Sequence, residues 1–183
     1  MENPYKRKKE PGLNKQLILD VATEIGAEDW SRVTFQAIAE KAGISKGGII
    51  HHFKNKEELL DELVKQSLSD LTAWVQQYKL DNQSDDGALA YLSAILTNES
   101  NKKYRDTMRI IIQATMTNES YRLSWDDWYK KNIMPADGNL SVESMIVLFL
   151  AEGIWYSENI GFSQVNQKDK LKMLHYVRTK MLT

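Results

Sequence analysis

Residues 34–53 read TFQAIAEKAGISKGGIIHHF, and this stretch decides the fold of the N-terminal part of the chain. Thr34 is suited to cap a short helix that carries Ile38 and Ala39 on one face. Gly43 follows that helix, where a helix C-terminus favours a residue that tolerates the left-handed conformation. Ser45 is suited to cap a second short helix. Two short helices joined by a tight turn that contains glycine form a helix-turn-helix unit.

The second helix contains two adjacent glycines in its first turn, Gly47 and Gly48. Each glycine inside a helix costs roughly 1 kcal/mol relative to alanine. One interpretation is that the missing side chains let the start of the helix come close to a phosphate backbone or a groove edge. The alternative is that the glycines fray a short helix or permit close packing inside the protein. The sequence alone leaves both interpretations open.

The composition is that of a globular protein with a sizeable core, because 42% of the 183 residues are hydrophobic and 27% are charged. The chain has no cysteine, which excludes disulfides, thiolate zinc sites and cysteine nucleophiles. The longest uncharged apolar run, residues 144–151, has eight residues, whereas a membrane-spanning helix needs about 20. No apolar segment follows the basic N-terminus, so we expect no secretory signal. These features predict a cytoplasmic protein that does not bind membranes.

Charge is distributed unevenly along the chain. Residues 1–56 contain 10 Lys and Arg against 7 Asp and Glu, a net charge of +3, whereas residues 57–183 contain 14 against 18, a net charge of −4. A basic N-terminal part suits contact with a polyanion, and chance is the alternative explanation for so modest a difference. The arm Lys6-Arg7-Lys8-Lys9 has two interpretations, minor-groove binding or solvated lysines.

Apolar residues recur at helical spacing along the chain, and no segment alternates as a strand does. One long stripe predicts a helix over residues 55–79, with Asn55 as its N-cap and Glu58 three residues later. Further helices are expected at residues 87–96, 102–116, 121–133, 141–160 and 166–182. We therefore predict an all-α protein of about nine helices. Its predicted parts are an arm at residues 1–12, a helix-turn-helix domain at 13–56 and a C-terminal domain at 57–183.

Residues 13–63 resemble the DNA-binding domain of the tetracycline-repressor (TetR) family, through the pattern Thr34…Ile38-Ala39…Ala42-Gly43-Ile44-Ser45-Lys46-Gly47…His52-Phe53-Lys54-Asn55-Lys56-Glu57…Leu59. The resemblance implies a three-helix DNA-binding head, a connecting helix and an all-α domain for effector binding and dimerisation. It also implies a dimeric repressor that leaves its operator when a small molecule binds. The sequence departs from the family pattern in three places. Asp29 replaces a glycine and is still able to form a left-handed turn, Gly48 replaces a threonine, and Ile50-His51 replaces a tyrosine pair.

Side chains that read DNA must reach base edges or phosphates. Lys46 is our first candidate for a base edge or flanking phosphate, and Lys56 resembles a phosphate anchor of the family. The alternative for each residue is an exposed position with no DNA contact. We expect Thr34 and Ser45 to act first as helix caps and only second as hydrogen-bond donors to phosphates. The chain has three histidines, and we expect no metal site and no cofactor. The full set of DNA-binding candidates is Thr34, Gln36, Ser45, Lys46, Gly47, Gly48, His51 and Lys56.

The C-terminal half is rich in large apolar and aromatic side chains, which suit a pocket for an apolar or aromatic effector. Three of them, Trp125, Trp128 and Tyr129, share one helix face through their spacing. The alternative is that these side chains only fill the core. The ligand-binding candidates are Trp74, Met108, Ile112, Met116, Trp125, Trp128, Tyr129 and Trp155.

The last two predicted helices are the candidates for dimerisation. Residues 141–161 would form a helix of about 31 Å, and Gly153 would allow a second helix to approach closely. A symmetric dimer would present two recognition helices to palindromic half-sites about 34 Å apart. The interface candidates are Met145, Ile146, Phe149, Leu150, Gly153, Ile154, Leu171 and Leu174.

The prediction is therefore a homodimeric, ligand-responsive regulator of the TetR type that represses transcription and is not an enzyme. Two alternatives belong to other classes. One is a DNA-binding regulator without a small-molecule ligand, whose aromatic residues are only core. The other is a helical small-molecule enzyme with a vestigial DNA-binding head, against which stands the lack of a Gly-x-Ser-x-Gly elbow or a phosphate-binding glycine loop.

Overall fold

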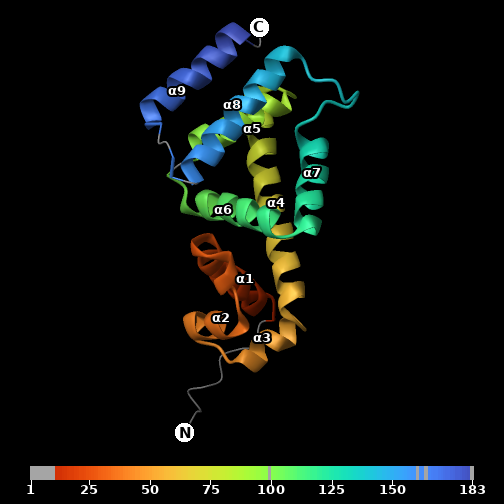
Figure 1. The fold of residues 1–183 in the computed structure, drawn as a ribbon, viewed down its shortest axis with the longest axis vertical. Coiled ribbons are helices and arrows are strands. Elements are labelled where there is room, and N and C mark those ends of the chain that lie inside the picture. Colours follow the sequence, from red (N-terminus) through yellow and green to blue (C-terminus); the bar gives the residue numbers. More distant parts are fainter. Residues whose placement is uncertain (1–10, 99, 160, 163–164, 182–183) are drawn as a thin grey trace. The chain divides into compact units, whose positions relative to one another are not determined.

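The structure, a computed structural model, describes residues 11–98, 100–159, 161–162 and 165–181. Within these ranges the regular structure is entirely helical, which confirms the predicted all-α fold (Figure 1). Nine α-helices lie in the described part of the chain, as expected, with short helical turns at Trp30–Arg32 and Val177–Met181. The α-helices are α1 (Pro11–Glu28), α2 (Phe35–Ala42), α3 (Lys46–His52), α4 (Lys56–Asn82), α5 (Gly87–Thr97), α6 (Lys102–Thr117), α7 (Glu119–Asn132), α8 (Val142–Asn159) and α9 (Gln167–Tyr176).

The chain divides into two compact units, Met1–Lys65 and Gln66–Thr183. Helix α4 begins in the first unit and ends in the second. None of the helices in the described ranges combines the length and the apolar character needed to cross a lipid bilayer.

The first unit has a small core made by α1, α2, α3 and the start of α4. Ile18 of α1, Ile38 of α2 and Ile49 of α3 have no exposed surface, and Phe53 after α3 is 1% exposed. Two surface ion pairs join its helices, Lys15 with Glu62 at 2.8 Å and Lys41 with Glu24 at 3.1 Å. Helices α2 and α3 are too short to be stable alone, so this shared core holds them in place.

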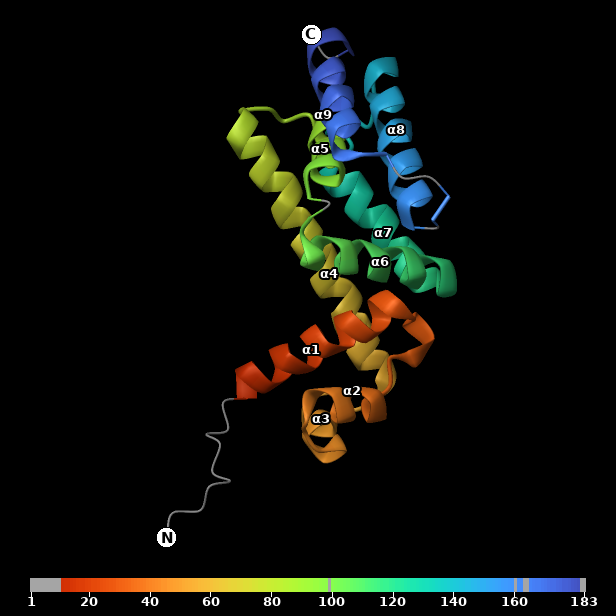
Figure 2. The ribbon, with the colours of Figure 1, turned by 90° about the vertical axis from the view of Figure 1, so that its left-hand side faces the viewer.

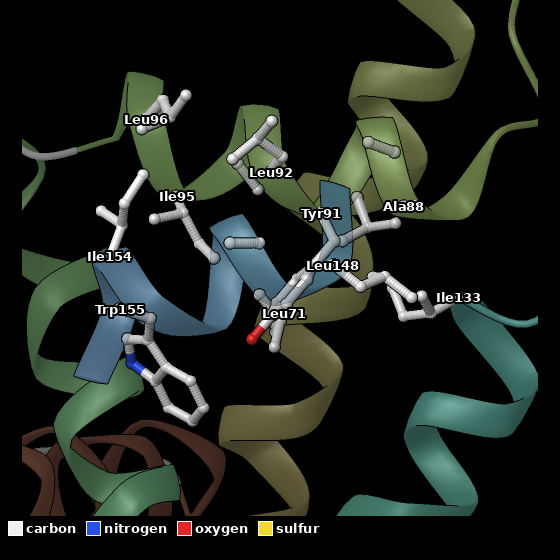
Figure 3. Packing of buried hydrophobic residues seen from close by; sticks show 14 of the residues in the cluster. Leu71, Ala88, Tyr91, Leu92, Ile95, Leu96, Ile133, Leu148, Ile154 and Trp155 are labelled. Carbon is white, nitrogen blue, oxygen red and sulfur yellow. The ribbon is translucent and has the colours of Figure 1, made fainter. Parts of the chain in front are cut away.

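Helix α5 is the centre of the second unit. Each of its residues from Gly87 to Leu96 is buried, and α5 packs against α8 and α9. Figure 3 shows this packing, in which Leu92 and Ile95 of α5 lie near Leu148 and Ile154 of α8. Helix α6 packs on α7 and runs crosswise to it (Figure 2). A fully buried Lys170 of α9 pairs with Glu158 of α8 at 2.5 Å.

Gly87 allows the start of α5 to lie against the end of α7. A Cβ atom on Gly87 would lie 2.4 Å from the carbonyl oxygen of Ile133 and 2.7 Å from its Cα. No side chain fits at this distance, so the close approach requires glycine. Asp86 caps the same helix, since its side chain accepts a hydrogen bond from the Leu89 N–H at 2.8 Å.

The predicted helix boundaries of the second unit agree with the structure to within a few residues, because Asn and Asp caps define the starts. Asn118 caps α7, so that helix begins at Glu119, two residues earlier than predicted. The helix predicted at 166–182 is shorter as an α-helix, because α9 ends at Tyr176. A π-helical turn, Val177–Met181, follows it. Asp29, which is able to form a left-handed turn, does not form one here. Asp29 has an extended backbone with φ −156°, and its side chain accepts hydrogen bonds from the N–H and the hydroxyl of Ser31.

Candidate functional site

Helices α2 and α3 form the helix-turn-helix unit that the sequence predicts. Thr34 caps α2 by accepting a hydrogen bond from the Ala37 N–H at 3.1 Å, and Ser45 caps α3 by accepting from the Gly48 N–H at 3.1 Å. Gly43 ends α2 in the left-handed conformation, with φ 65°. The caps and the glycine turn are the local reasons why α2 stops and α3 starts here.

One side of α3 is anchored and the other side faces outward. Ile49 has no exposed surface and Phe53, directly after the helix, is 1% exposed, whereas Lys46, Gly47 and His51 are exposed. All eight residues predicted to contact DNA are exposed, namely Thr34, Gln36, Ser45, Lys46, Gly47, Gly48, His51 and Lys56. The outer surface of α3 is therefore accessible along its length.

The two glycines of α3 have no packing role inside the described structure. A Cβ atom on Gly47 would have only the Ser45 hydroxyl within 4 Å, at 4.0 Å, and one on Gly48 would meet the same oxygen at 3.4 Å. Both distances are ordinary contacts. Close internal packing, one part of the alternative interpretation, therefore has no support here, and the missing side chains leave space on the outer surface.

The other DNA-binding candidates lie around α3. Gln36 donates a hydrogen bond to Glu40 at 2.6 Å, which holds its amide along the surface of α2. Lys56 is the first residue of α4, where Asn55 accepts a hydrogen bond from the Glu58 N–H at 2.8 Å. The rings of His51 and His52 are 5.4 Å apart in an edge-on arrangement. Among the residues that the structure describes, no three His, Asp or Glu side chains are grouped closely enough to hold a metal ion. Residues 1–10 of the predicted basic arm lie outside the described residues.

A second candidate site is an aromatic cluster in the second unit. Trp125 and Trp128 of α7 stack with ring centroids 5.0 Å apart, and the Tyr91 ring of α5 lies 6.2 Å from Trp128 and 6.5 Å from Tyr129. Trp155 of α8 lies 5.5 Å from Trp125. The cluster thus brings together four of the eight predicted ligand-binding residues, Trp125, Trp128, Tyr129 and Trp155.

The other four ligand-binding candidates lie apart from this cluster. Met108 lines a small neighbouring pocket of about 80 Å³, which Trp155 also borders. Trp74 packs edge-on against Tyr104, another residue of that pocket, at 5.0 Å. Ile112 is part of the buried core, and Met116 is 77% exposed, so neither lines the pocket or the cluster.

Glu152 of α8 is a functional candidate that the sequence interpretation missed. Burial raises the pKa of its carboxyl to about 7, although an interaction with the Tyr91 hydroxyl acts in the opposite direction. Burial also raises the pKa of Tyr129 to about 12, to which the nearby Glu152 contributes. The signal was present in the sequence, because Glu152 follows Leu148 by four residues and precedes Trp155 by three, and so shares their buried face.

The predicted dimer residues divide into exposed and buried sets. Phe149 is 78% exposed and Leu171 51% exposed, whereas Ile154 and Leu174 are 6% and 5% exposed and belong to the core of their own chain. A Cβ atom on Gly153 would have no described atom within 4 Å. Met145 and Ile146 are also exposed, and Leu150 is half-buried beside a shallow groove that Phe149 and Gly153 line.

Two family models match the chain. The model described as "Bacterial regulatory proteins, tetR family" matches residues 18–63. The model described as "Tetracyclin repressor-like, C-terminal domain" matches residues 85–179, which is more than half of the chain.

Individual proteins are similar over parts of the chain. The transcriptional repressor KstR2 of Rhodococcus jostii is 42% identical over 55 residues, 30% of this chain and 27% of the relative. The transcriptional regulator AcrR of Shigella flexneri is 28% identical over 148 residues, 76% of this chain and 62% of the relative. The chain thus spans less than two thirds of the length of either relative.

The fold is also shared with solved structures. The multidrug binding protein EbrR in complex with ethidium superposes with a TM-score of 0.60 at 13% identity, over 90% of this chain and 97% of that chain. The helix-turn-helix geometry agrees with the family model that matches residues 18–63, and a second model of the same family matches residues 85–179. The chain belongs to the tetR family of bacterial regulatory proteins.

Proposed function

We propose that this protein is a homodimeric transcriptional repressor that binds a palindromic operator and is released from it by a small molecule. The observation that carries the proposal is the outward surface of α3, on which Lys46, Gly47 and His51 are exposed while Ile49 anchors the helix from behind. A helix held in this way is suited to enter the major groove. The names of KstR2 and AcrR support a regulatory rather than an enzymatic role.

In this proposal each candidate has a distinct part in DNA binding. Lys46 reads a base edge or a flanking phosphate, and Gly47 and Gly48 let the backbone of α3 come close to the DNA. Lys56, Thr34 and Ser45 contact phosphates, and the positive charge of Lys56 makes that contact salt-dependent. Gln36 and His51 lie beside this surface and contribute further polar contacts.

The exposed apolar face of α8 and α9 is the proposed dimer interface. Phe149, Ile146 and Leu171 are at least half exposed, an unfavourable arrangement for large apolar side chains in a monomer. Gly153 adds a flat position on α8 where a second helix is able to approach. The occupant is a second copy of the chain, because a two-fold dimer supplies the second recognition helix that a palindromic operator requires.

The second unit is the proposed effector domain. The aromatic cluster of α5, α7 and α8 and the adjacent pocket supply an apolar setting for a small ligand. The similarity in fold to EbrR, solved with ethidium, supports this assignment. The ligand would favour a conformation of the second unit that is incompatible with operator binding, and α4 would carry the change because it belongs to both units.

The decisive experiment is selection of bound DNA from a random duplex pool with the purified protein, followed by affinity measurements on the selected sequence. We expect a palindromic motif and two protomers bound to each duplex. Lys46→Ala should weaken binding by about 1–3 kcal/mol, whereas Lys130→Ala, at an exposed position on α7, should leave it unchanged. Enrichment of no sequence, together with no retained duplex at low salt, would refute the proposal.

A further inference from the structure

Ile50 is a large apolar side chain on the outer surface of α3. It is 48% exposed, although burial stabilises an aliphatic side chain of this size. Among the described side chains of the first unit, the other exposed large apolar one is Leu17 of α1, at 39%. Ile49, next to Ile50 in the sequence, has no exposed surface. Ile49 therefore anchors α3 in the core, and the exposure of Ile50 has no explanation in the packing of its own chain.

The neighbours of Ile50 on the helix surface belong to the proposed DNA-binding surface. Lys46 lies four residues before Ile50, Gly47 lies three residues before it, and both are exposed. Side chains of a helix lean toward its N-terminus, so the side chain of Ile50 lies over the turn that holds these two residues. Ile50 is therefore continuous with the surface that the proposed function presents to DNA.

Gly47 leaves one flank of the Ile50 side chain uncovered. A Cβ atom on Gly47 would have only the Ser45 hydroxyl oxygen within 4 Å, so no side-chain atom of Ile50 lies within 4 Å of that point. A larger residue at position 47 would place its side chain beside Ile50. The glycine instead leaves the isoleucine as an apolar projection that a partner surface is able to contact from the side.

The major groove of DNA offers one apolar group to such a side chain. Its base edges carry hydrogen-bond donors and acceptors, and the C5 methyl group of thymine is the exception. Isoleucine has no donor or acceptor, so contact with a polar base edge would displace water without replacing its hydrogen bonds. Contact with a thymine methyl group removes apolar surface from water on both partners.

We propose that Ile50 determines part of the operator sequence, by placing its side chain against the C5 methyl group of one thymine in each half-site. The inference rests on the proposed operator binding and adds the base that one residue of α3 selects. Lys46 has a different kind of partner, because its ammonium group needs an acceptor on a base edge or phosphate. Burial of one methyl group contributes roughly fourfold to an equilibrium constant, so a symmetric pair of contacts contributes about 15-fold.

The test removes single methyl groups from the operator selected from the random duplex pool. Each thymine of a half-site, together with its symmetry mate, is replaced by deoxyuridine, which keeps the base pair and lacks only the methyl group. Fluorescence anisotropy measures the affinity of the unmodified protein, of Ile50→Ala and of Leu17→Ala for each duplex. We expect one symmetric pair of replacements to weaken binding of the unmodified protein about 15-fold.

The two variants assign this loss to a residue. In Ile50→Ala the same pair of replacements should weaken binding by about threefold or less, because the side chain that contacts the methyl group is truncated. Leu17→Ala is the matched control, since Leu17 is an exposed aliphatic residue of the same unit and lies outside the helix-turn-helix. It should keep the full loss. Circular dichroism confirms that both variants are folded, and light scattering gives their masses.

Three results on the operator would each overturn the inference: half-sites without thymine on either strand, an affinity that no deoxyuridine replacement changes, or an equal loss in Ile50→Ala. A smaller mass for Ile50→Ala than for Leu17→Ala would place Ile50 between two protein chains and overturn the inference as well. Tight operator binding that depends on no methyl group would refute this inference alone. A protein that retains no duplex at low salt would refute the proposed function, and the inference with it.

Discussion

The indole N–H of Trp128 donates a hydrogen bond of 2.8 Å to the hydroxyl of Thr72, although the two residues are 56 positions apart in the sequence. The same hydroxyl donates to the carbonyl of Leu68 at 2.8 Å, so it acts as acceptor and donor at once. This pair joins α7, which carries part of the aromatic cluster, to the C-terminal half of α4. A buried indole N–H is costly to leave without an acceptor.

Thr72→Val keeps the shape of the side chain and removes the acceptor. We expect the free energy of unfolding to fall by about 1–3 kcal/mol, because the Trp128 N–H would stay buried without a partner. Urea unfolding followed by tryptophan fluorescence measures the change. Thr97→Val is the matched control, since the Thr97 hydroxyl donates to the Ser93 carbonyl of its own helix. An equal loss in the two variants would contradict the assigned role of the Trp128 bond.

Gly87→Ala should destabilise the second unit. The added Cβ would lie 2.4 Å from the Ile133 carbonyl oxygen, so α5 and α7 would have to separate. We expect a loss of at least about 1–3 kcal/mol, although alanine favours helix elsewhere. Thermal unfolding measures the effect. A melting temperature equal to or higher than that of the unmodified protein would show that the close approach is not required.

Gly47→Ala should raise the stability of the protein and lower its affinity for the operator. No described atom restricts a Cβ at this position, so alanine should raise the free energy of unfolding by about 0.5 kcal/mol through its helix preference. Operator affinity should fall, because the new methyl group occupies the surface that approaches DNA. Fluorescence anisotropy with labelled operator measures this affinity, and an unchanged value would remove Gly47 from the interface.

Phe149→Glu should convert the proposed dimer into a monomer. Phe149 is 78% exposed, so the substitution should leave the fold of one protomer intact while placing a charge in an apolar interface. Light scattering after size-exclusion chromatography measures the mass. The control is Leu123→Glu on α7, which is 53% exposed and lies outside the proposed interface. A dimer that persists in Phe149→Glu would place the interface elsewhere.

Stability should depend on pH through Glu152. Its pKa is about 7 in the folded protein and 4.5 in an unperturbed carboxyl, so the folded state holds a proton that the unfolded chain releases between these values. The free energy of unfolding should therefore fall as the pH rises from 4.5 to 7, by at most about 3 kcal/mol. Glu152→Gln should remove this fall, and urea unfolding across the range measures it.

The other groups with shifted pKa values act mainly outside this range. The tyrosines around Glu152 have pKa values raised above 10 and stay neutral throughout the range. Asp29, Glu62 and Asp169 have lowered pKa values, so their contribution to stability is lost only as the pH falls below about 4. A stability that rises between pH 4.5 and 7, or one that Glu152→Gln leaves with the same slope, would contradict the assignment.

The fold was predictable from sequence where local chemistry decides it. Thr34, Gly43 and Ser45 each act through a backbone contact a few residues away, so their spacing alone indicates where α2 and α3 begin and end. The apolar period of α8 is equally local. Asp29 also acts locally, because its side chain caps a short turn with Ser31 while its backbone is extended.

The candidate effector site depended on contacts that the sequence does not encode locally. Trp125, Trp128 and Tyr129 come from one helix and were predictable as a group, but Tyr91 and Trp155 join them only through packing of α5 and α8. Met116 has the same helical spacing as its neighbours in α6 yet points outward. Glu152 was missed because charged residues are usually solvated, although its spacing from the buried Leu148 and Trp155 already places it on their side of α8.

The buried pair of Lys170 and Glu158 has a consequence for how two chains would assemble. A lysine without exposed surface that pairs with a carboxylate at 2.5 Å joins α9 to α8 within each protomer, since separating the helices would break this ion pair and their shared packing. Each protomer would then meet its partner with α8 and α9 already packed together. Association would proceed as a simple second-order collision, without a slow refolding phase, and mixed dimers would form by exchange of whole protomers.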